Sequence, residues 1–597
     1  EMLLYLTRHD VLTPEGAVRL FTKNLISDSL KMRKIGICAV SAVLKQQKRK
    51  HPKEEFDPYE IAGCEKPRPE ELVPMGVRED NKWLLYTKES NVFESQEVWD
   101  KTTFVEKTHW AYSRWPKVMY KYCSADKQPT LGRSLSEVRK EESPILEFFQ
   151  VAENVEQLIK HLTLEENKGK DKFSSSTFML WKGLFRSFDD TILPHLKPQV
   201  ETLLADTKHD THEISQRCAL EIIAGMIRGC KHWTYSKMKT MWEWIIPILR
   251  SALNNITVES IGDWGTCFAT AFESRDPRKL SPLIELLMED PLSGDGGSFG
   301  DSSRLYVLQG ALAQQEWRVA EPLHRLLKYL TPYLTHPYKN VRDRLGSFLV
   351  NLFMYDFPSA NATQTNCPLV TDFTKMVLPE LQILKQPLAE HSENTNGKKP
   401  ISATKTDSSK GKNDKNESSS RQDLEMSVLE KGAVGKESKE SSAAQGDNDE
   451  HKNISNSANT ASPVETSTVD TSTVDGNGES EERKTAVKLC KTVMKWLQGS
   501  HTRMFRTCWT EFYEFLPILC QLESETKDDE LRTEGLHCLA CMAQSLVDPA
   551  NVPHLLDAVK QVLELDSWHA RTVILGYLQI MVFSNLFVMS SHRDTVR

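Results

Sequence analysis

The stretch HPYKNVRDRLGSFLVNLF, residues 336–353, carries the pattern on which the fold prediction depends. Its opening histidine and proline are typical of a turn, and the residues that follow place apolar side chains at helical spacing. Arg342 stands where the turn becomes the expected helix. This position leaves two alternatives. Arg342 holds a phosphate or a substrate, or it is a packing residue that is repeated along the chain.

The same arrangement returns in four other segments. In each, an arginine is followed by apolar residues seven and ten positions later, which lie on one face of a helix. The arginines are Arg33, Arg217, Arg342, Arg532 and Arg571, followed by Val40, Ala224, Leu349, Leu539 and Leu578, and then by Val43, Ile227, Leu352, Met542 and Met581. Helices with such a face bury it by stacking on neighbours. Stacked arginines could pair with acidic neighbours or with a polyanion, and the pattern favours hydrogen bonding between repeats.

Amphipathic helical periods cover most of the chain, whereas alternating strand patterns are rare. Clear examples are residues 16–26, 155–164, 219–227, 237–253, 282–289, 321–330 and 554–565. Arg532 and Arg571 are 39 residues apart, close to the roughly 40 residues of one HEAT unit. We therefore expect an all-α fold, an α-solenoid of irregular HEAT-like helical repeats.

Composition divides the chain into five segments. HEAT-like helices are expected in residues 1–50, 141–386 and 485–597. Residues 51–140 are richer in proline, aromatics and charge, and we expect an irregular segment packed on the solenoid. Residues 387–484 have no aromatic side chain from 391 to 480 and repeat TSTVD in tandem. Such a sequence buries too little apolar surface to become ordered, so we expect a disordered insertion that serves as a solvated linker.

Length, charge and cysteine content limit the function classes. A chain of 597 residues exceeds the size of one hydrophobic core, and its net charge of −8 argues against bulk nucleic-acid affinity. Its 12 cysteines lack a disulfide framework, which favours a reducing compartment and leaves the sequons at Asn361 and Asn453 unused. No apolar run of about 18 residues predicts a membrane span, and no signal peptide is expected.

The loop SGDGGSFGDSSR, residues 293–304, invites comparison with phosphate-binding loops. Gly294 and Gly296 form the start of a glycine motif, but Phe299 occupies the place of the third glycine, and no GK[ST] follows. We expect a flexible turn between two helices rather than a nucleotide site.

Three further groups suggest chemistry, and each has a structural interpretation that we favour. Cys538 and Cys541, next to His537, form a single CxxC, and zinc needs four ligands, so a core position in a helix is expected. His209 and His212 fit a solvated turn before the helix of Arg217. The pairs Asp189–Asp190 and Asp528–Asp529 are expected at helix starts, where the helix dipole favours acidic residues.

Two basic segments complete the candidates. KQQKRKHPK (45–53) is a nuclear-localisation-like or polyanion-binding tract, or a solvated helix end, which we favour. VEKTHWAYSRWPK (105–117) could stack nucleic-acid bases or anchor a loop on the helices, which we favour. Its aromatic and basic residues are His109, Trp110, Tyr112, Trp115, Lys107, Arg114 and Lys117. We assign no catalytic or metal-binding residue, and cofactor-binding residues stay unknown.

Several runs of the chain have a distinctive sequence. The longest are QRCALEIIAGMIRGCKHWT (216–234), RLYVLQGALAQQEWRV (304–319) and DSWHARTVILGYLQIMVFSNLF (566–587). Shorter ones are FVEKTHWAYSRWPK (104–117), LGRS (131–134), KGKDKF (168–173), FRSFDD (185–190), ESRDPRKL (273–280), PLSGDGGSF (291–299), LHRLLKYL (323–330) and YKNVRDRLGS (338–347). These runs lie on both sides of the expected insertion and are more specific than general HEAT features. Together they resemble the proteasome activator subunit 4 family, whose members are large single-chain HEAT-repeat proteins.

The resemblance implies a non-catalytic activator or scaffold. Members of the family form a dome of HEAT-like repeats over the α-ring of the proteasome core particle and promote opening of its gate. They stimulate hydrolysis of peptides and proteins, including acetylated histones, without ATP or ubiquitin, in DNA repair and spermatogenesis. The resemblance further implies nuclear and cytoplasmic localisation, inositol polyphosphate as a ligand with no required cofactor, and neither a membrane nor a direct nucleic-acid partner.

The chain departs from the family pattern at its ends. It begins at Glu1 without methionine and stops at Arg597, so we expect an interior piece of a longer polypeptide or an incomplete gene model. The family's bromodomain-like region, which contacts acetylated histones, and its C-terminal docking tail would lie outside this chain. The alternative function is a HEAT-type nuclear transport receptor or scaffold, which a long repeat array with acidic balance also fits.

Overall fold

The structure is a computed structural model of the chain. It describes residues 13–46, 53–56, 119–122, 138, 140–164, 173–208, 211–230, 233–273, 280–294, 297–313, 320–353, 370–385, 480–503, 506–507, 509–525 and 528–596. These residues are mainly helical, and the predicted α-solenoid of HEAT-like repeats is confirmed. The chain separates into two compact units, the first comprising Glu1–Tyr333 and Asn351–Leu369, and the second Leu334–Val350 and Val370–Arg597.

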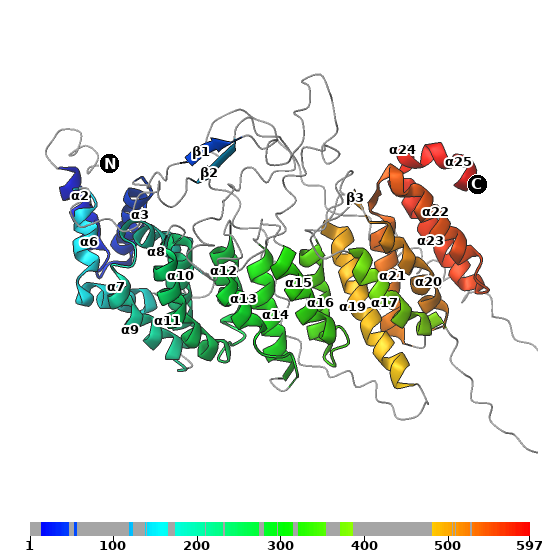
Figure 1. Cartoon of the computed structure of the whole chain (residues 1–597), viewed down its shortest axis with the longest axis horizontal. Helices are drawn as coiled ribbons and strands as arrows, with labels where there is room; N and C mark the ends of the chain where they lie inside the picture. The colour runs from blue at the N-terminus through cyan, green and yellow to red at the C-terminus, as the bar shows by residue number, and fades with distance from the viewer. Residues whose placement is uncertain are drawn as a thin grey trace, which may run out of the picture. The chain divides into compact units, whose positions relative to one another are not determined.

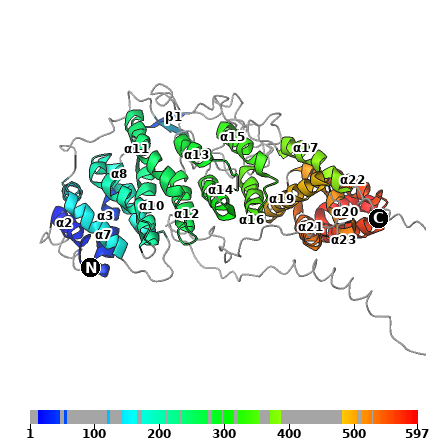
Figure 2. The same cartoon turned by 90° about the horizontal axis from the view of Figure 1, so that it is seen from below.

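The first unit stacks its helices in two layers (Figure 2). One layer contains α3 (Leu30–Gln46), α8 (Ser175–Phe188), α10 (His212–Gly229), α12 (Ile261–Phe272) and α14 (Gly297–Ala313). The other contains α7 (Ala152–Leu164), α9 (Leu193–Ala205), α11 (Tyr235–Leu253), α13 (Ser281–Met288) and α15 (Ala320–Leu330). The remaining elements are α2 (Pro14–Asn24), α6 (Ser143–Phe149), η7 (Thr331–Tyr333) and the antiparallel strands β1 (Lys53–Phe56) and β2 (Met119–Tyr122).

The second unit repeats this arrangement, and Figure 1 draws its helices partly in green and otherwise in yellow to red. One layer contains α19 (Glu481–Arg503), α21 (Asp529–Ala543) and α23 (Trp568–Ser584). The part of α16 (Lys339–Phe353) that belongs to the second unit packs beside α19 in the same layer. Against this layer pack α17 (Val370–Leu381), α20 (Leu516–Glu525) and α22 (Val552–Leu563). Short elements are η8 (Gln382–Lys385), η9 (Thr510–Phe515), η10 (Pro549–Asn551), α24 (Leu586–Met589), η11 (Ser590–His592), α25 (Arg593–Val596) and the parallel pair β3 (Arg506–Thr507) and β4 (Leu546–Val547).

Local sequence explains where the helices lie. Each of the seven amphipathic segments named above lies on a helix, and three of them run one or two residues past its end, which confirms the periodicity prediction. Several helices begin after a Ser, Thr or Asp whose side-chain oxygen accepts a hydrogen bond from a free N–H of the first turn. Thr13, for example, accepts from Gly16 N at 3.0 Å, and Ser567 accepts from Ala570 N at 3.2 Å.

The apolar positions that follow the five arginines are mostly core positions. Eight of the ten are buried, whereas Val43 and Leu578 are half-buried. Arg532 and Arg571 lie on α21 and α23, which are consecutive helices of the same layer. Their 39-residue spacing therefore corresponds to one structural repeat.

The described residues include only small parts of two of the expected segments, 51–140 and 387–484. The segment 51–140 is described only at β1, β2 and residues 138 and 140, so its expected packing on the solenoid lies outside the described residues. The insertion expected at 387–484 also lies outside them, except for its last five residues. There α19 begins at Glu481, earlier than the expected boundary at 485, because two acidic residues in its first turn and the Ser480 hydroxyl, which accepts from Arg483 N, favour a helix start.

Two layer helices of the first unit approach so closely that a glycine is required. A Cβ on Gly310 of α14 would lie 2.7 Å from the backbone oxygen of Gly265 on α12. Backbone cannot move aside as a flexible side chain can, so the helices would have to separate.

We expect Gly310→Ala to destabilise the first unit by about 2 kcal/mol, because the added methyl forces α12 and α14 apart. Gly300 lies on the same helix, and a Cβ there meets nothing within 4 Å. Gly300→Ala should instead stabilise the helix by roughly 0.5–1 kcal/mol through reduced backbone entropy. Thermal melting followed by circular dichroism compares the two, and equal shifts would contradict the close-packing argument.

Among the described residues, no single helix has both the length and the apolarity to cross a membrane. One pair of helical segments, α23 and Leu586–Val596, has the required length and apolarity when the two are taken together, but the chain bends by 103° between them.

Candidate functional site

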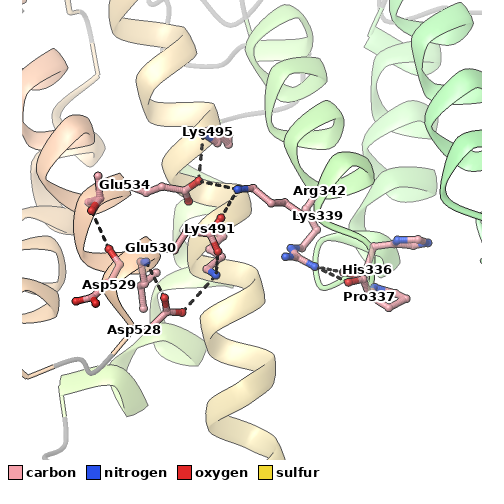
Figure 3. Close-up of polar contacts among 12 residues, drawn as sticks. His336, Pro337, Lys339, Arg342, Lys491, Lys495, Asp528, Asp529, Glu530 and Glu534 are labelled. Carbon is pink, nitrogen blue, oxygen red and sulfur yellow. Dashed lines mark hydrogen bonds and ion pairs between the residues drawn. The ribbon is translucent and has the colours of Figure 1, made fainter. Parts of the chain in front are cut away.

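Arg342 lies in the core of the second unit, at the fourth residue of α16 (Figure 3). Its side chain is only 1% exposed, and Nη1 donates to the carbonyl oxygens of His336 at 2.6 Å and Pro337 at 2.9 Å. The guanidinium thus satisfies two carbonyls of the turn that precedes its own helix. Such charge-assisted hydrogen bonds are stronger than those between neutral groups. Arg342 therefore fastens the turn to the helix and offers no exposed surface to a ligand.

Two other marked arginines make the same contact. Arg33 Nη1 donates to Ser27 O at 2.7 Å, and Arg571 Nε donates to Leu565 O at 2.6 Å. In each case, as at His336, the carbonyl lies six residues before the arginine. At these three positions the arginine of the pattern therefore fastens a turn to its helix, a contact that the pattern itself did not predict.

The remaining two arginines differ. Arg217 Nε donates to Asp263 Oδ2 on α12 at 3.0 Å and its Nη2 pairs with Glu213 at 2.5 Å, so here the expected bond between repeats exists. Arg532 pairs with Asp529 at the exposed start of α21. An arginine at the same point of the helical pattern can thus bond to the preceding turn, to a carboxylate of a neighbouring repeat or to a carboxylate at the start of its own helix.

A cluster of lysines and carboxylates joins α16, α19 and α21 (Figure 3). Lys339 pairs with Glu530 and lies 3.7 Å from Glu534. Lys491, which is buried, lies 2.9 Å from Glu530, and Lys495 lies 3.4 Å from Glu534. Hydrogen bonds from Lys339 and Lys491 lower the pKa of Glu530 from its ordinary value to about 2.

This lysine–carboxylate cluster is closed by the N-cap of α21. Asp528 accepts from Leu531 N at 3.0 Å and lies 3.3 Å from Lys491 Nζ. The three lysines are thus matched by three carboxylates, Asp528, Glu530 and Glu534, so the cluster has little surplus positive charge for a polyanion. Partly buried networks of this kind hold helices in register.

A second polar cluster lies inside the first unit, where the sequence analysis expected no site. Glu221 Oε1 on α10 accepts from Ser174 N at 2.5 Å, and Asp263 Oδ1 on α12 accepts from Phe173 N at 3.0 Å. Two helices therefore hold the backbone that leads into α8. Burial raises the pKa of Glu221 to about 8, and it also raises the pKa of Asp263 although Arg217 opposes this.

The sequence contained one signal for this cluster. Glu221 interrupts the apolar run ALEIIAGMI, and Asp263 lies within the buried face of IGDWGTCF. A lone carboxyl in an apolar run indicates a buried group that needs hydrogen-bond partners.

The other candidates are placed as follows. Cys538 is fully buried in α21, whereas Cys541 is half-buried and its sulfur lies 3.8 Å from His537 Nε2. His209 lies outside the described residues. His212 is buried and its Nδ1 lies 2.7 Å from Asp206 O, so the expected solvated turn is wrong there because the ring closes the α9–α10 connection.

The two aspartate pairs also differ from each other. Asp528 caps the start of α21 as expected. Asp189, however, follows the last residue of α8 with φ of 61°, so the expectation of a helix start is wrong there. Lys237 donates to Asp189 Oδ2 at 2.5 Å and to Asp190 Oδ1 at 2.9 Å, and this cation compensates the unfavourable dipole of the helix end.

The glycine-rich loop 293–304 is partly helical. α14 begins at Gly297, so the expected flexible turn is wrong for residues 297–304. Gly294 and Gly297 have φ of 82° and 73°, a region that favours glycine, and Gly294 N donates to Asp301 Oδ2 at 2.8 Å. This carboxylate organises the loop from within the helix.

A pocket of about 490 Å³ lies beside this loop. Asn254, Asp290, Asp301 and Arg304 are among its lining residues. Arg304 Nη2 already pairs with Asp290 Oδ2 at 2.6 Å and donates to Asn254 Oδ1 at 3.0 Å. Because two carboxylates face one neutralised guanidinium, the pocket does not suit a phosphate.

The basic and aromatic tracts fall largely outside the described residues. Lys45 lies in the last turn of α3, at a helix end, but residues 47–52 and the aromatic segment 105–117 are not described. Within the ranges that are described, no group of three or more His, Cys, Asp or Glu could hold a metal ion. The polar clusters of the described residues connect neighbouring helices to one another.

Comparison with known proteins identifies the relatives of the chain. Residues 16–310 match the family described as proteasome activator complex subunit 4-like, HEAT repeat-like. Proteasome activator complex subunit 4 of Xenopus laevis is 43% identical over 598 residues, and that of Homo sapiens is 42% identical over 599 residues. Both alignments cover 100% of this chain and 28% of the relative, so the chain spans less than a third of either relative.

Among solved structures, importin beta aligns with 99% of this chain and 49% of its own, at 10% identity and a TM-score of 0.32.

The fold and its polar contacts between helices define an α-solenoid of HEAT-like repeats. The sequence adds a likeness: at about 42% identity over its whole length, this solenoid is similar to a segment of proteasome activator complex subunit 4, and residues 16–310 match the HEAT repeat-like model of that family.

Proposed function

We propose that the chain supplies part of the solenoid of a proteasome activator, as a regulator or scaffold without catalytic residues of its own. Identity of 43% over the complete chain to a relative named as a proteasome activator subunit supports this. The close helix contacts and matched charges of the described residues fit a rigid structural part. In this role the chain contributes to a dome that caps the α-ring of the core particle and promotes degradation without ATP or ubiquitin.

The finer parts of the proposal are supported by the family resemblance alone. They are action on acetylated histones, through a region outside this chain, roles in DNA repair and spermatogenesis, and presence in nucleus and cytoplasm. Inositol polyphosphate is proposed as a ligand on the same ground. Lys339, Lys491 and Lys495 are unsuitable for it, because each already pairs with carboxylates.

A chimera tests the proposal. Residues 1–597 replace the matching segment of the Xenopus laevis relative, and the purified protein is mixed with latent core particle. If the two segments are equivalent, the chimera should raise hydrolysis of a fluorogenic peptide and co-sediment with the core particle, as the unmodified relative does. A folded chimera that does neither, beside an active unmodified relative, would sink the proposal.

A further inference from the structure

The pocket beside the loop 293–304 lies within the first unit, where helices of both layers end or begin. Its walls come from the end of α11, from the connection that follows α13 and from the first two turns of α14. Its volume of about 490 Å³ is in the range of sites for small molecules. The proposed activator role does not use this pocket.

Polar contacts hold the walls of the pocket together. Arg304 on α14 pairs with Asp290, which follows α13, and donates to Asn254, which follows α11. Tyr329 Oη on α15 donates to Asp290 O at 2.9 Å. Four successive helices therefore fix the shape of the pocket without a ligand, and a preformed site lowers the entropic cost of binding.

The charges of the walls favour a cation. Asp290 and Asp301 bring two negative charges and Arg304 brings one positive charge, so one negative charge is in excess. The side chain of Asp290 is 53% exposed, which leaves its carboxylate accessible beside Arg304. α11 ends at this wall, and the dipole at the C-terminus of a helix favours positive charge. The start of α14 has the opposite dipole, but Asp301 places a full negative charge there.

The rest of the wall is apolar except for one hydroxyl. Leu253, Ile256 and Phe299 line the pocket and are half-buried. An aromatic ring attracts an ammonium group through its negative face. Ser303 also lines the pocket and is 3% exposed, and its Oγ has no hydrogen-bond partner among the described residues. A ligand that donates a hydrogen bond at this wall would supply the missing partner.

We propose that this pocket binds a small organic ammonium compound. The charged head lies against the carboxylates of Asp290 and Asp301, and the apolar body lies against Phe299 and the aliphatic wall. An anion would be repelled by the excess negative charge, and a wholly apolar molecule would cover carboxylates without giving them a partner. Free amines and lysine side chains carry the same ammonium group. A free amine is the proposed source, because a pocket of this volume encloses a whole small molecule.

Three probes of similar shape test the charge preference on the 597-residue chain. They are phenethylammonium, 2-phenylethanol and 3-phenylpropionate, titrated by ligand-observed NMR at about pH 7, where the amine is protonated and the acid is ionised. We expect phenethylammonium to bind with a Kd of roughly 1 mM and the alcohol to bind more weakly, whereas the acid should not bind. A blocked pentapeptide with one central lysine should bind more weakly than phenethylammonium, and tighter binding of the peptide would overturn the free-amine assignment.

Two substitutions with opposite expected effects separate recognition from damage to the pocket. Arg304→Gln keeps a donor for Asn254 but removes the positive charge, so phenethylammonium should bind at least about threefold more tightly. Asp290→Asn leaves Arg304 without its carboxylate, so binding should weaken by at least about threefold. A substitution that merely disturbed the pocket would weaken binding in both variants. Arg325→Gln is the matched control, because Arg325 pairs with Glu285 outside the pocket and its loss should leave the Kd unchanged.

Three results would overturn the proposal. One is tighter binding of 3-phenylpropionate than of phenethylammonium together with its loss in Arg304→Gln, which would indicate an anion site. Another is the absence of phenethylammonium binding at about 10 mM to a chain that circular dichroism shows to be folded. The third is an equal change of Kd in Arg304→Gln and Arg325→Gln, which would indicate attraction by the overall charge of the chain.

Discussion

Replacement of Arg342 by alanine should destabilise the second unit by about 3 kcal/mol. The substitution leaves the carbonyls of His336 and Pro337 without their charged donor and opens a cavity beneath the turn. Arg342→Met fills most of the side-chain volume but cannot donate a hydrogen bond. It should therefore recover the stability lost to the cavity and not the stability lost with the two hydrogen bonds. Differential scanning calorimetry of the full chain measures the shift.

Arg532→Ala is the matched control. Arg532 also occupies the fourth helical position of its segment, but it pairs with Asp529 at an exposed helix start. We expect a change within about 0.5 kcal/mol, because surface ion pairs contribute little. If Arg342→Ala left the melting temperature unchanged but abolished binding of inositol hexakisphosphate, Arg342 would be a ligand residue instead.

Replacement of Glu221 by glutamine should remove the pH dependence that this carboxyl group gives to the stability of the fold. Glu221 has a pKa of about 8 in the folded chain, against an ordinary value near 4.5. Between these values the folded state holds a proton that the unfolded state releases. The stability contributed by protonated Glu221 is therefore complete below about pH 4.5 and is lost as pH rises through about 8. Glutamine keeps an acceptor for Ser174 N and does not ionise, so the variant should be the more stable protein above about pH 8.

Melting temperatures of the variant and the wild type at about pH 6 and about pH 9 measure this difference. Glu213→Gln serves as the control, because Glu213 lies on the same helix and near the same Arg217 but has a side chain 46% exposed. Its difference from the wild type should stay nearly constant over that range. A wild type that is as stable as Glu221→Gln at pH 9 would contradict the burial of an ionisable Glu221.

Helical spacing is a local property, and it explains what could be predicted. The amphipathic periods and the arginine-marked helices indicated an all-α repeat protein, and the described residues agree. The partners of those arginines were not predictable, because Arg342 and Arg571 bond to turns whose path depends on packing. His212 looked solvated by composition but is buried, because α9 and α10 close around it.

The sequence by itself determined the helical class, the repeat spacing from Arg532 to Arg571 and the resemblance to proteasome activator complex subunit 4. Each of these depends on residues close together in the chain or on identity along it. The tertiary structure alone decided which polar groups became buried and which apolar groups stayed exposed. Glu221 is enclosed because α8, α10 and α12 meet around it, and Phe583 is exposed because the described residues cover only one side of α23. Burial depends on neighbours distant in sequence, and a local pattern does not specify them.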